Sequence, residues 1–369
     1  MEDMVIDRSF WAGKRVLLTG HTGFKGSWLS LWLQALGAKT VGYALHPTAS
    51  PNLFEVANVA NAVTSVEADV RDLDRLSREI AKHRPEIIFH LAAQSLVRRS
   101  YADPVETYGT NVMGTVNLLE AVRKTKGIRA VVNVTSDKCY ENLEWIWGYR
   151  ESDRLGGFDP YSNSKACAEL VTAAYRNSFF GGVPSAEPAP AVASARAGNV
   201  IGGGDWAADR LIPDIILALT ENRPAQIRNP SAIRPWQHVL EPLWGYLLLA
   251  QQLCCDGPQY AGAWNFGPSD ADTKTVEWVT EFVTRRWRGG GRWTQDKSSH
   301  PHETRSLRLD CSKAYAYLGW QPRLSVATAL EMTVDWYQAK QDGNDMSTFT
   351  RTQIDSYQSL QKPLNDTGN

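Results

Sequence analysis

The stretch from Arg15 to Gly26, RVLLTGHTGFKG, decides the fold. Its first five residues are apolar or β-branched apart from Arg15, as in a buried strand, and the glycines that follow have the spacing GxxGxxG. A helical pattern of apolar residues begins at Phe24 and runs to Leu36. A strand, a glycine turn and a helix in this order place backbone N–H groups where they can hold a pyrophosphate. The sequence therefore predicts a dinucleotide site at this turn.

Two other interpretations of the turn are weaker. A P-loop needs the order Gly-Lys-Ser, whereas Lys25, Gly26 and Ser27 stand in the order Lys-Gly-Ser. A chance glycine triple in a loop does not explain why a strand pattern precedes the turn and a helix pattern follows it.

The alternation of strand and helix continues along the first half of the chain and predicts an α/β fold: a Rossmann-type, doubly wound parallel sheet with helices on both faces. The strands expected after the first one are 40–45, 62–68, 87–91, 130–135 and 191–197, and the main helices are 73–82, 107–124 and 161–175. A Gly- and Pro-rich stretch at 181–190 predicts an exposed loop.

The later part of the chain predicts a smaller, intertwined C-terminal lobe that binds substrate. We expect the dinucleotide domain to comprise 11–201 with a return segment at about 235–268, and the substrate lobe to comprise 202–234 and 269–340. Residues 341–369 are rich in polar side chains and predict a polar tail that is partly disordered.

Composition excludes several classes of partner. The chain has 39 basic and 40 acidic residues and a formal net charge of -1, which does not fit a nucleic-acid binder or a polybasic membrane-surface protein. The apolar stretch 242–255 is shorter than the roughly 18 to 20 residues of a membrane span and predicts a buried helix. The acidic N-terminus lacks a secretory pattern.

Cysteine and histidine usage predicts a cytoplasmic protein without a metal. The five cysteines are odd in number and have no CxxC spacing, as expected of reduced thiols. A His-Pro-His-Glu run at 300–303 lacks a third distant ligand and helical spacing, so we expect no metal site there.

Two segments carry candidate reactive groups. Tyr161 and Lys165 are four residues apart on an expected helix and share one face. A phenol has a pKa of about 10 and is a poor base at neutral pH, but a neighbouring ammonium and a positive nicotinamide ring favour the phenolate. Ser136, Asp137 and Lys138 follow the fifth strand, at the sheet edge where ligands bind. The alternatives are an exposed helix face and a surface ion pair.

These motifs together resemble the extended short-chain dehydrogenase/reductase family. The resemblance rests on the GxxGxxG turn, on Asp69-Val70 after the third strand, on 91–94 after the fourth, and on Tyr161 with Lys165. It implies NAD as cofactor. The residues implied to contact the cofactor are Gly20, Thr22, Gly23, Phe24, Lys25, Gly26, Asp69, Val70, Leu91, Ala92, Ala93, Gln94, Tyr161 and Lys165.

Two points qualify the cofactor assignment. Without the glycine turn, the simplest interpretation of Asp69 would be a helix N-cap or a turn residue. The family's NAD users carry an acid at the end of the second strand, whereas residues 43–46, Tyr-Ala-Leu-His, contain none, nor an Arg that would hold the extra phosphate of NADP. NAD remains the expected cofactor.

Within this family the chain is similar to the nucleotide-sugar 4,6-dehydratases. The segment after the fifth strand resembles their Thr-Asp-Glu triplet, with Ser136 and Asp137 matching and Lys138 in place of Glu. The runs 133–142, 144–149, 159–169 and 195–207 extend the resemblance. It implies that CDP-glucose is converted to CDP-4-keto-6-deoxyglucose, a source of deoxy and dideoxy sugars for lipopolysaccharide O-antigen. The catalytic residues implied are Ser136, Asp137, Lys138, Tyr161 and Lys165.

The resemblance also implies substrate contacts and an assembly. Asn199 matches a nucleotide-sugar contact and Arg234 an arginine that meets a diphosphate, while Arg210, Leu211 and Arg305 are further candidates. His238 is a candidate too, although a lone His is more often a packed structural residue. Family members pair through two long helices, here 107–124 and 161–176, so we expect a homodimer or a dimer of dimers.

Two other functions stay open. An epimerase or reductase, or a dehydratase acting on GDP- or dTDP-hexoses, would use the same scaffold. A non-catalytic NAD-sensing scaffold is a different class, which Tyr161 and Lys165 argue against.

The chain has 14 tryptophans, more than a core strictly needs. Trp28 and Trp32 lie on the apolar face of the first helix and predict core positions. Four others flank the ligand-facing motifs and are candidates for the pocket wall, namely Trp145, Trp147, Trp206 and Trp236.

Overall fold

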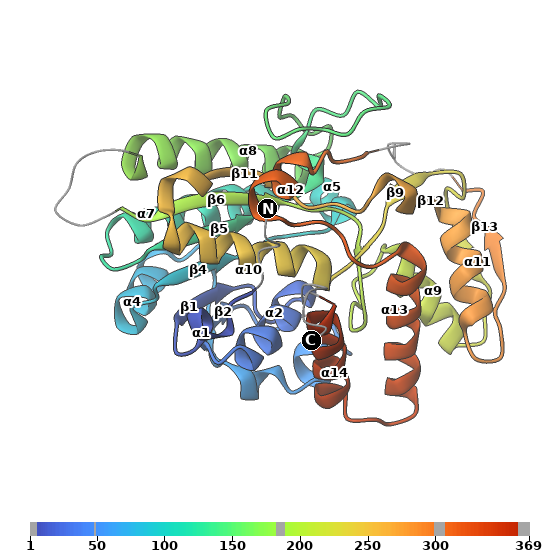
Figure 1. The fold of residues 1–369 in the computed structure, drawn as a ribbon. Helices are drawn as coiled ribbons and strands as arrows, with labels where there is room; N and C mark the ends of the chain where they lie inside the picture. Colours follow the sequence, from blue (N-terminus) through green and yellow to red (C-terminus); the bar gives the residue numbers. More distant parts are fainter. Residues whose placement is uncertain (1–5, 48, 182–188, 299–306, 361–369) are drawn as a thin grey trace, which may run out of the picture.

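A seven-stranded sheet organises the computed structural model, which describes residues 6–47, 49–181, 189–298 and 307–360. The strand order is β11-β6-β5-β4-β1-β2-β3, and every pairing in it is parallel (Figure 1). The strands are β1 (Arg15–Thr19), β2 (Lys39–Ala44), β3 (Thr64–Glu67), β4 (Ile87–His90), β5 (Ala130–Val134), β6 (Ala191–Arg196) and β11 (Gly262–Asn265). The predicted Rossmann-type parallel sheet is confirmed.

Helices cover both faces of this sheet (Figure 1). Because side chains alternate along a strand, Val16 and Leu18 of β1 join one core and Leu17 joins the other. The first core is completed by α2 (Phe24–Ala35) and α10 (Leu240–Cys255), and the second by α4 (Leu73–His83), α7 (Gly114–Arg123) and α8 (Pro160–Tyr175). Two hydrophobic cores, one on each face of the sheet, therefore fix the strand ends that carry the predicted site.

Short elements complete the chain between and after the sheet strands. Three two-stranded pieces, β10-β7, β12-β9 and β13-β8, lie outside the main sheet. Further α-helices are α1 (Arg8–Trp11), α3 (Leu53–Val56), α5 (Val97–Ala102), α6 (Pro104–Tyr108), α9 (Leu211–Thr220), α11 (Val276–Arg286), α12 (Ser312–Leu318) and α13 (Val326–Gln341). The short strands are β7 (Val200–Ile201), β8 (Ala225–Ile227), β9 (Ile233–Pro235), β10 (Gln237–His238), β12 (Thr273–Thr275) and β13 (Trp293–Gln295).

After the small strands β7 to β10, the chain returns to the main sheet through α10 and β11, and β12 and β13 follow this return. The sequence predicts such a return to the dinucleotide domain at about 235–268. The division of the chain into two lobes with the predicted boundaries stays a prediction. The expected loop 181–190 lies mostly outside the described residues.

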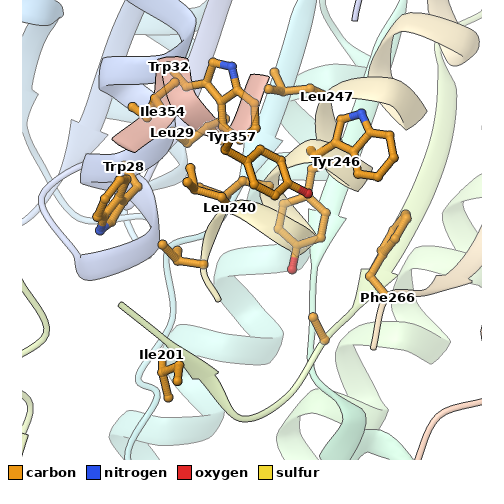
Figure 2. Close-up of a cluster of buried hydrophobic side chains, with 14 of the residues drawn as sticks. Trp28, Leu29, Trp32, Ile201, Leu240, Tyr246, Leu247, Phe266, Ile354 and Tyr357 are labelled. Atoms are coloured by element: carbon orange, nitrogen blue, oxygen red, sulfur yellow. The ribbon is translucent and has the colours of Figure 1, made fainter. Parts of the chain in front are cut away.

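Residues 346–359 of the expected polar tail form helix α14 (Met346–Ser359), so this part of the tail is ordered. Asp345 caps this helix, and its buried face includes Met346, Ile354 and Tyr357. Figure 2 shows Ile354 and Tyr357 beside Trp32, and the rings of Trp32 and Tyr357 meet edge to face at 5.8 Å. The apolar positions are few but have helical spacing, so a composition dominated by polar residues hid a helix that closes the core over α2.

Tryptophan fills much of the core. Trp28 and Trp32 are fully buried, which confirms the prediction for them, and Trp11, Trp244 and Trp336 are fully buried as well. Among the described residues, no helix combines the length and apolar character that a membrane span requires.

Candidate active site

A cavity of about 1080 Å³ opens at the carboxyl edge of the parallel sheet. Its lining includes Gly20 after β1, Leu91 after β4, Thr135 after β5 and Ala197 after β6. This edge is the place where open parallel sheets bind ligands. The predicted cofactor residues all line the cavity: Gly20, Thr22, Gly23, Phe24, Lys25, Gly26, Asp69, Val70, Leu91, Ala92, Ala93, Gln94, Tyr161 and Lys165.

The glycine turn is shaped for close backbone approach. Gly20 has φ 76°, and a Cβ there would lie 2.7 Å from the backbone nitrogen of Ala92. A Cβ on Gly26 would lie 2.0 Å from the carbonyl oxygen of Gly20, so neither position admits a side chain. Gly23 is the N-cap of α2 and makes no side-chain cap, which leaves the helix N-terminus open to the cavity. These residues fit a dinucleotide pyrophosphate.

The far end of the cavity is built around Asp69. Its carboxylate accepts two bonds from Arg71, at 2.8 Å from Nε and 2.5 Å from Nη2, and its carbonyl oxygen accepts the Tyr43 hydroxyl at 2.9 Å. At the end of β2 no acid faces the cavity; Leu45 and His46 line it instead. The acid that NAD users of the family carry at the end of the second strand is therefore absent here, and no other described carboxylate of this strand end takes its place.

Tyr161 and Lys165 lie one turn apart near the start of α8 and are both buried in the cavity wall. Asp159 caps the helix by accepting the backbone N–H of Ser162 at 2.9 Å. Burial raises the pKa of Tyr161 to about 12, while a hydrogen bond with Ser136 lowers it. Burial lowers the pKa of Lys165 to about 8, and Glu169 opposes this shift. Burial thus shifts the two pKa values in opposite directions, because it disfavours the charged form of each group.

The segment after β5 brings a hydroxyl, a carboxyl and an amine to the same place. Ser136 Oγ donates to Asp137 Oδ1 at 3.0 Å, and Lys138 Nζ lies 4.0 Å from the same oxygen. Asp137 is only 1% exposed, so the alternative of a surface ion pair is wrong for its carboxyl. Asp137 Oδ2 is buried and has no hydrogen-bond partner among the described residues. Ser136, Asp137 and Lys138 all line the cavity.

Gly198 makes room for the Asp137 carboxyl, a role that the sequence did not indicate. A Cβ on Gly198 would lie 1.8 Å from Asp137 Oδ2 and 2.0 Å from its Cγ. The carboxyl therefore occupies the space of the missing side chain. Gly198 stands in the run Ala-Gly-Asn at 197–199, but only the fold shows which group meets the glycine.

Cationic side chains also line the cavity, in a part that we call the cationic wall, and Arg210 there is close enough to Tyr161 to lower its pKa. Arg210 pairs with Asp205 at 2.8 Å and donates to Ser95 Oγ at 3.0 Å. Lys25 lines the cavity as well, and burial, with Arg210 and Lys165 nearby, lowers the pKa of its amine to about 7. Asp205 was not predicted; its only sequence signal was its place in the GGGDW run. The other predicted substrate residues that line the cavity are Asn199, Leu211 and Arg234.

The prediction of a substrate contact at His238 is wrong. Its side chain is fully buried and does not line the cavity. The ring lies edge-on to Trp28 at 5.8 Å, and Nδ1 accepts the backbone N–H of Leu240 at 3.4 Å. Burial lowers the pKa of His238 to about 3, so it is a neutral packing residue, as the alternative interpretation held. Arg305 lies outside the described residues.

Only two of the four tryptophans proposed for the pocket wall line the cavity, namely Trp206 and Trp236. Trp145 stacks on Tyr149 at 5.1 Å, and Trp147 is 67% exposed. The error arose because nearness to a motif along the chain does not fix the direction of a loop. Within the described ranges, no group of three or more His, Cys, Asp or Glu side chains is arranged to hold a metal, and the run 300–303 is not described.

The sheet, the glycine turn and the Tyr161–Lys165 helix define the class of extended short-chain dehydrogenases/reductases. A family model described as GDP-mannose 4,6 dehydratase matches residues 17–333. The chain therefore belongs to this family of nucleotide-sugar dehydratases, which confirms the resemblance drawn from its motifs.

Three relatives show the range of similarity. A CDP-glucose 4,6-dehydratase of Salmonella typhimurium is 54% identical over 96% of this chain and 99% of its own length. A UDP-glucose 4-epimerase of Mycolicibacterium smegmatis is 30% identical over 88% of this chain and 99% of its own. A solved structure of dTDP-glucose 4,6-dehydratase from Streptomyces venezuelae, with NAD and TYD bound, is 25% identical, covers 90% of this chain and 99% of its own, and has a TM-score of 0.74.

We predict that Gly198→Ala displaces the Asp137 carboxyl while the fold survives, because the colliding atoms end a side chain that can rotate away. Turnover of a nucleotide sugar should fall by roughly 100-fold, the scale expected for one lost acid–base group. The matched control is Gly156→Ala, whose Cβ meets its nearest neighbour, the Glu141 side chain, at 3.5 Å. Equal turnover of the two variants in a steady-state assay would contradict the role of Gly198.

Proposed function

We propose that the chain converts CDP-glucose to CDP-4-keto-6-deoxyglucose with loss of water, through oxidation at C4, elimination across C5 and C6, and reduction at C6. The observation that carries this proposal is that Ser136, Asp137 and Lys138 line the cavity together with Tyr161, and that Ser136 and Asp137 are buried there. A simple epimerase or reductase has no use for an added acid and base next to its tyrosine. The identity to a CDP-glucose 4,6-dehydratase supports the choice of nucleotide.

NAD would be held by the glycine turn from Gly20 to Gly26, by Asp69 and Val70 at the adenosine end, and by Leu91 to Gln94 along its length. When bound, it supplies a hydride acceptor for C4 and a hydride donor for C6. The open N-terminus of α2 and the close approaches at Gly20 and Gly26 support this placement. Because the net oxidation is zero, we expect the cofactor to stay bound between turnovers.

Tyr161 removes the proton of the sugar 4-hydroxyl. Burial alone raises the pKa of its phenol, so the phenolate needs nearby positive charge and hydrogen-bond donors. Lys165 on the same helix face provides the charge, and Ser136 provides a hydrogen bond. Ser136 is also placed to orient the sugar, since its hydroxyl lies in the cavity wall.

Asp137 and Lys138 carry out the elimination. The 4-ketone acidifies the C5 hydrogen, Lys138 takes that proton, and the C5–H electrons form the C5–C6 double bond as the C6–O bond breaks. Asp137 donates a proton to the departing hydroxyl, which leaves as water. For this role Lys138 has to be neutral when it acts and Asp137 has to be protonated. Asp137 Oδ2 has no hydrogen-bond partner among the described residues, so this oxygen is available to carry the proton.

The diphosphate binds at the cationic wall. Arg210 and Arg234 both line the cavity, and a guanidinium suits the geometry of phosphate oxygens. Asn199 and Leu211 contribute a polar and an apolar contact to the nucleotide sugar. Arg305 is a further candidate for the diphosphate that lies outside the described residues.

The oligomeric state, the cellular location and the use of the product are also part of the proposal. We expect a homodimer or a dimer of dimers that pairs through 107–124 and 161–176, where Met113 and Leu170 expose apolar surface. The free cysteines support a reducing, cytoplasmic location. The product would supply deoxy and dideoxy sugars for lipopolysaccharide O-antigen.

The proposal predicts that the purified protein, incubated with CDP-glucose, produces a 4-keto-6-deoxy sugar, seen by its alkali-sensitive absorbance, without net formation of NADH. GDP- and dTDP-hexoses should react far more slowly. Turnover of one of these but not of CDP-glucose would contradict the nucleotide assignment. Conversion of CDP-glucose to CDP-galactose alone would favour an epimerase, and tight NAD binding without any turnover would favour a sensing scaffold.

The base role of Lys138 predicts that Lys138→Met abolishes exchange of the C5 hydrogen with solvent deuterium, because no amine remains to take the proton. Reaction should stop at the 4-keto hexose, detected by mass spectrometry of the trapped sugar. Lys138→Glu is the matched variant, since it restores the triplet of the related dehydratases and should retain exchange. Undiminished exchange in Lys138→Met would exclude this role.

A further inference from the structure

A buried ion pair lies behind the candidate active site. Arg196 Nη2 donates to Glu169 Oε2 at 2.8 Å, and both side chains are 3% exposed. Glu169 follows Lys165 by one turn on α8, and Arg196 ends β6. Neither residue lines the large cavity, so neither is placed to touch substrate or cofactor.

Each side chain of the pair also holds the segment that follows β5. Glu169 Oε1 accepts the hydroxyl of Thr135, the residue just before Ser136. Arg196 Nη1 donates to the Tyr140 hydroxyl at 2.7 Å, and its guanidinium stacks on the Tyr140 ring at 4.8 Å. The pair thus contacts both ends of the short segment that contains Ser136, Asp137 and Lys138.

Further hydrogen bonds fix the pair itself. Glu169 Oε2 accepts the Ser194 hydroxyl at 2.6 Å, and Arg196 Nη1 also donates to the carbonyl oxygen of Glu151 at 3.2 Å. The Tyr140 hydroxyl in turn donates a hydrogen bond to Asn265 Oδ1 of β11 at 2.7 Å. A buried ion pair of this kind costs desolvation energy and is weak evidence for added stability, so its contacts invite another explanation.

Glu169 also bears on the charge of Lys165. Besides Tyr161 on the same helix face, the described titratable groups that interact with Lys165 are Glu169 from its own helix, Cys139 after β5, His90 of β4 and Lys25 of α2. Burial raises the pKa of the Cys139 thiol and lowers the pKa of His90 to about 3, so both are neutral near pH 7. Glu169 is therefore the anion that favours the ammonium form of Lys165.

We infer that Glu169 and Arg196 are positioning residues, which lock the segment 135–140 against α8 and keep Lys165 cationic beside Tyr161. The inference about turnover rests on the proposed function. Its chemical consequence does not, because the ionisation of Lys165 is a property of the protein without substrate.

The test compares three variants with the wild type. Glu169→Gln keeps the side-chain shape but removes the anion. Thr135→Val removes one hydroxyl and leaves the ion pair. Glu241→Gln is the control, because Glu241 is equally buried, accepts the Tyr357 hydroxyl at 2.7 Å and the Leu324 N–H at 2.7 Å, and does not line the cavity.

We expect Glu169→Gln to lower kcat for CDP-glucose by roughly 10- to 100-fold with little change in KM, since small misplacements of reacting groups have effects of this size. Without the anion the pKa of Lys165 falls, so the ammonium loses its proton at lower pH. The alkaline limb of the pH–kcat profile should therefore move to lower pH. Thr135→Val should lower kcat without moving that limb, and Glu241→Gln should change neither.

A second readout needs no substrate. The pH dependence of acetic anhydride labelling at Lys165, followed by peptide mass spectrometry, should shift to lower pH in Glu169→Gln and stay unchanged in Glu241→Gln. Unshifted labelling in folded Glu169→Gln would overturn the electrostatic role, and unchanged kcat in Thr135→Val would overturn the positioning role even if Glu169→Gln does not fold. Absence of wild-type turnover would count against the proposed function alone, because the labelling still decides the ionisation.

Discussion

Burial of ionisable groups at the carboxyl ends of β5 and β6 is the constraint on which the rest of the site depends. Asp137, Tyr161, Lys165 and Glu169 are all enclosed there, and each buried charge requires a partner or a neutral form. The sheet supplies the geometry that makes this tolerable, because parallel strands bring their loops to one edge. Stability of the site and its chemistry therefore come from the same contacts.

The burial also explains why glycine recurs around the cavity. At Gly20 and Gly26 the turn packs so closely that no side chain fits, and at Gly198 the missing side chain leaves the space for the Asp137 carboxyl. One set of glycines thus lets the backbone approach a dinucleotide, and another lets an acid enter the wall. Both features are properties of packing, and neither depends on flexibility.

The sequence predicted the parts of the molecule that depend on short-range pattern. Six of the seven strands of the main sheet, the glycine turn and the Tyr161–Lys165 face follow from periodicity and spacing, whereas strand β11 was not predicted. It did not predict helix α14, whose few apolar residues are diluted by polar ones, or the packing of His238 against Trp28. The contacts of Gly198 and of the Glu169–Arg196 pair join distant segments, so no local pattern reveals them.

The central claim is an internal transfer of hydride within one sugar, and one measurement addresses it directly. A mixture of unlabelled CDP-glucose and CDP-glucose that carries deuterium at C4 and ¹³C throughout its hexose would be converted, and the isotopic composition of the product would be analysed by mass spectrometry and NMR. The account predicts deuterium at C6 of the molecules that carried it at C4, with none in the others. Deuterium that is lost, exchanged between molecules or retained at C4 would contradict it.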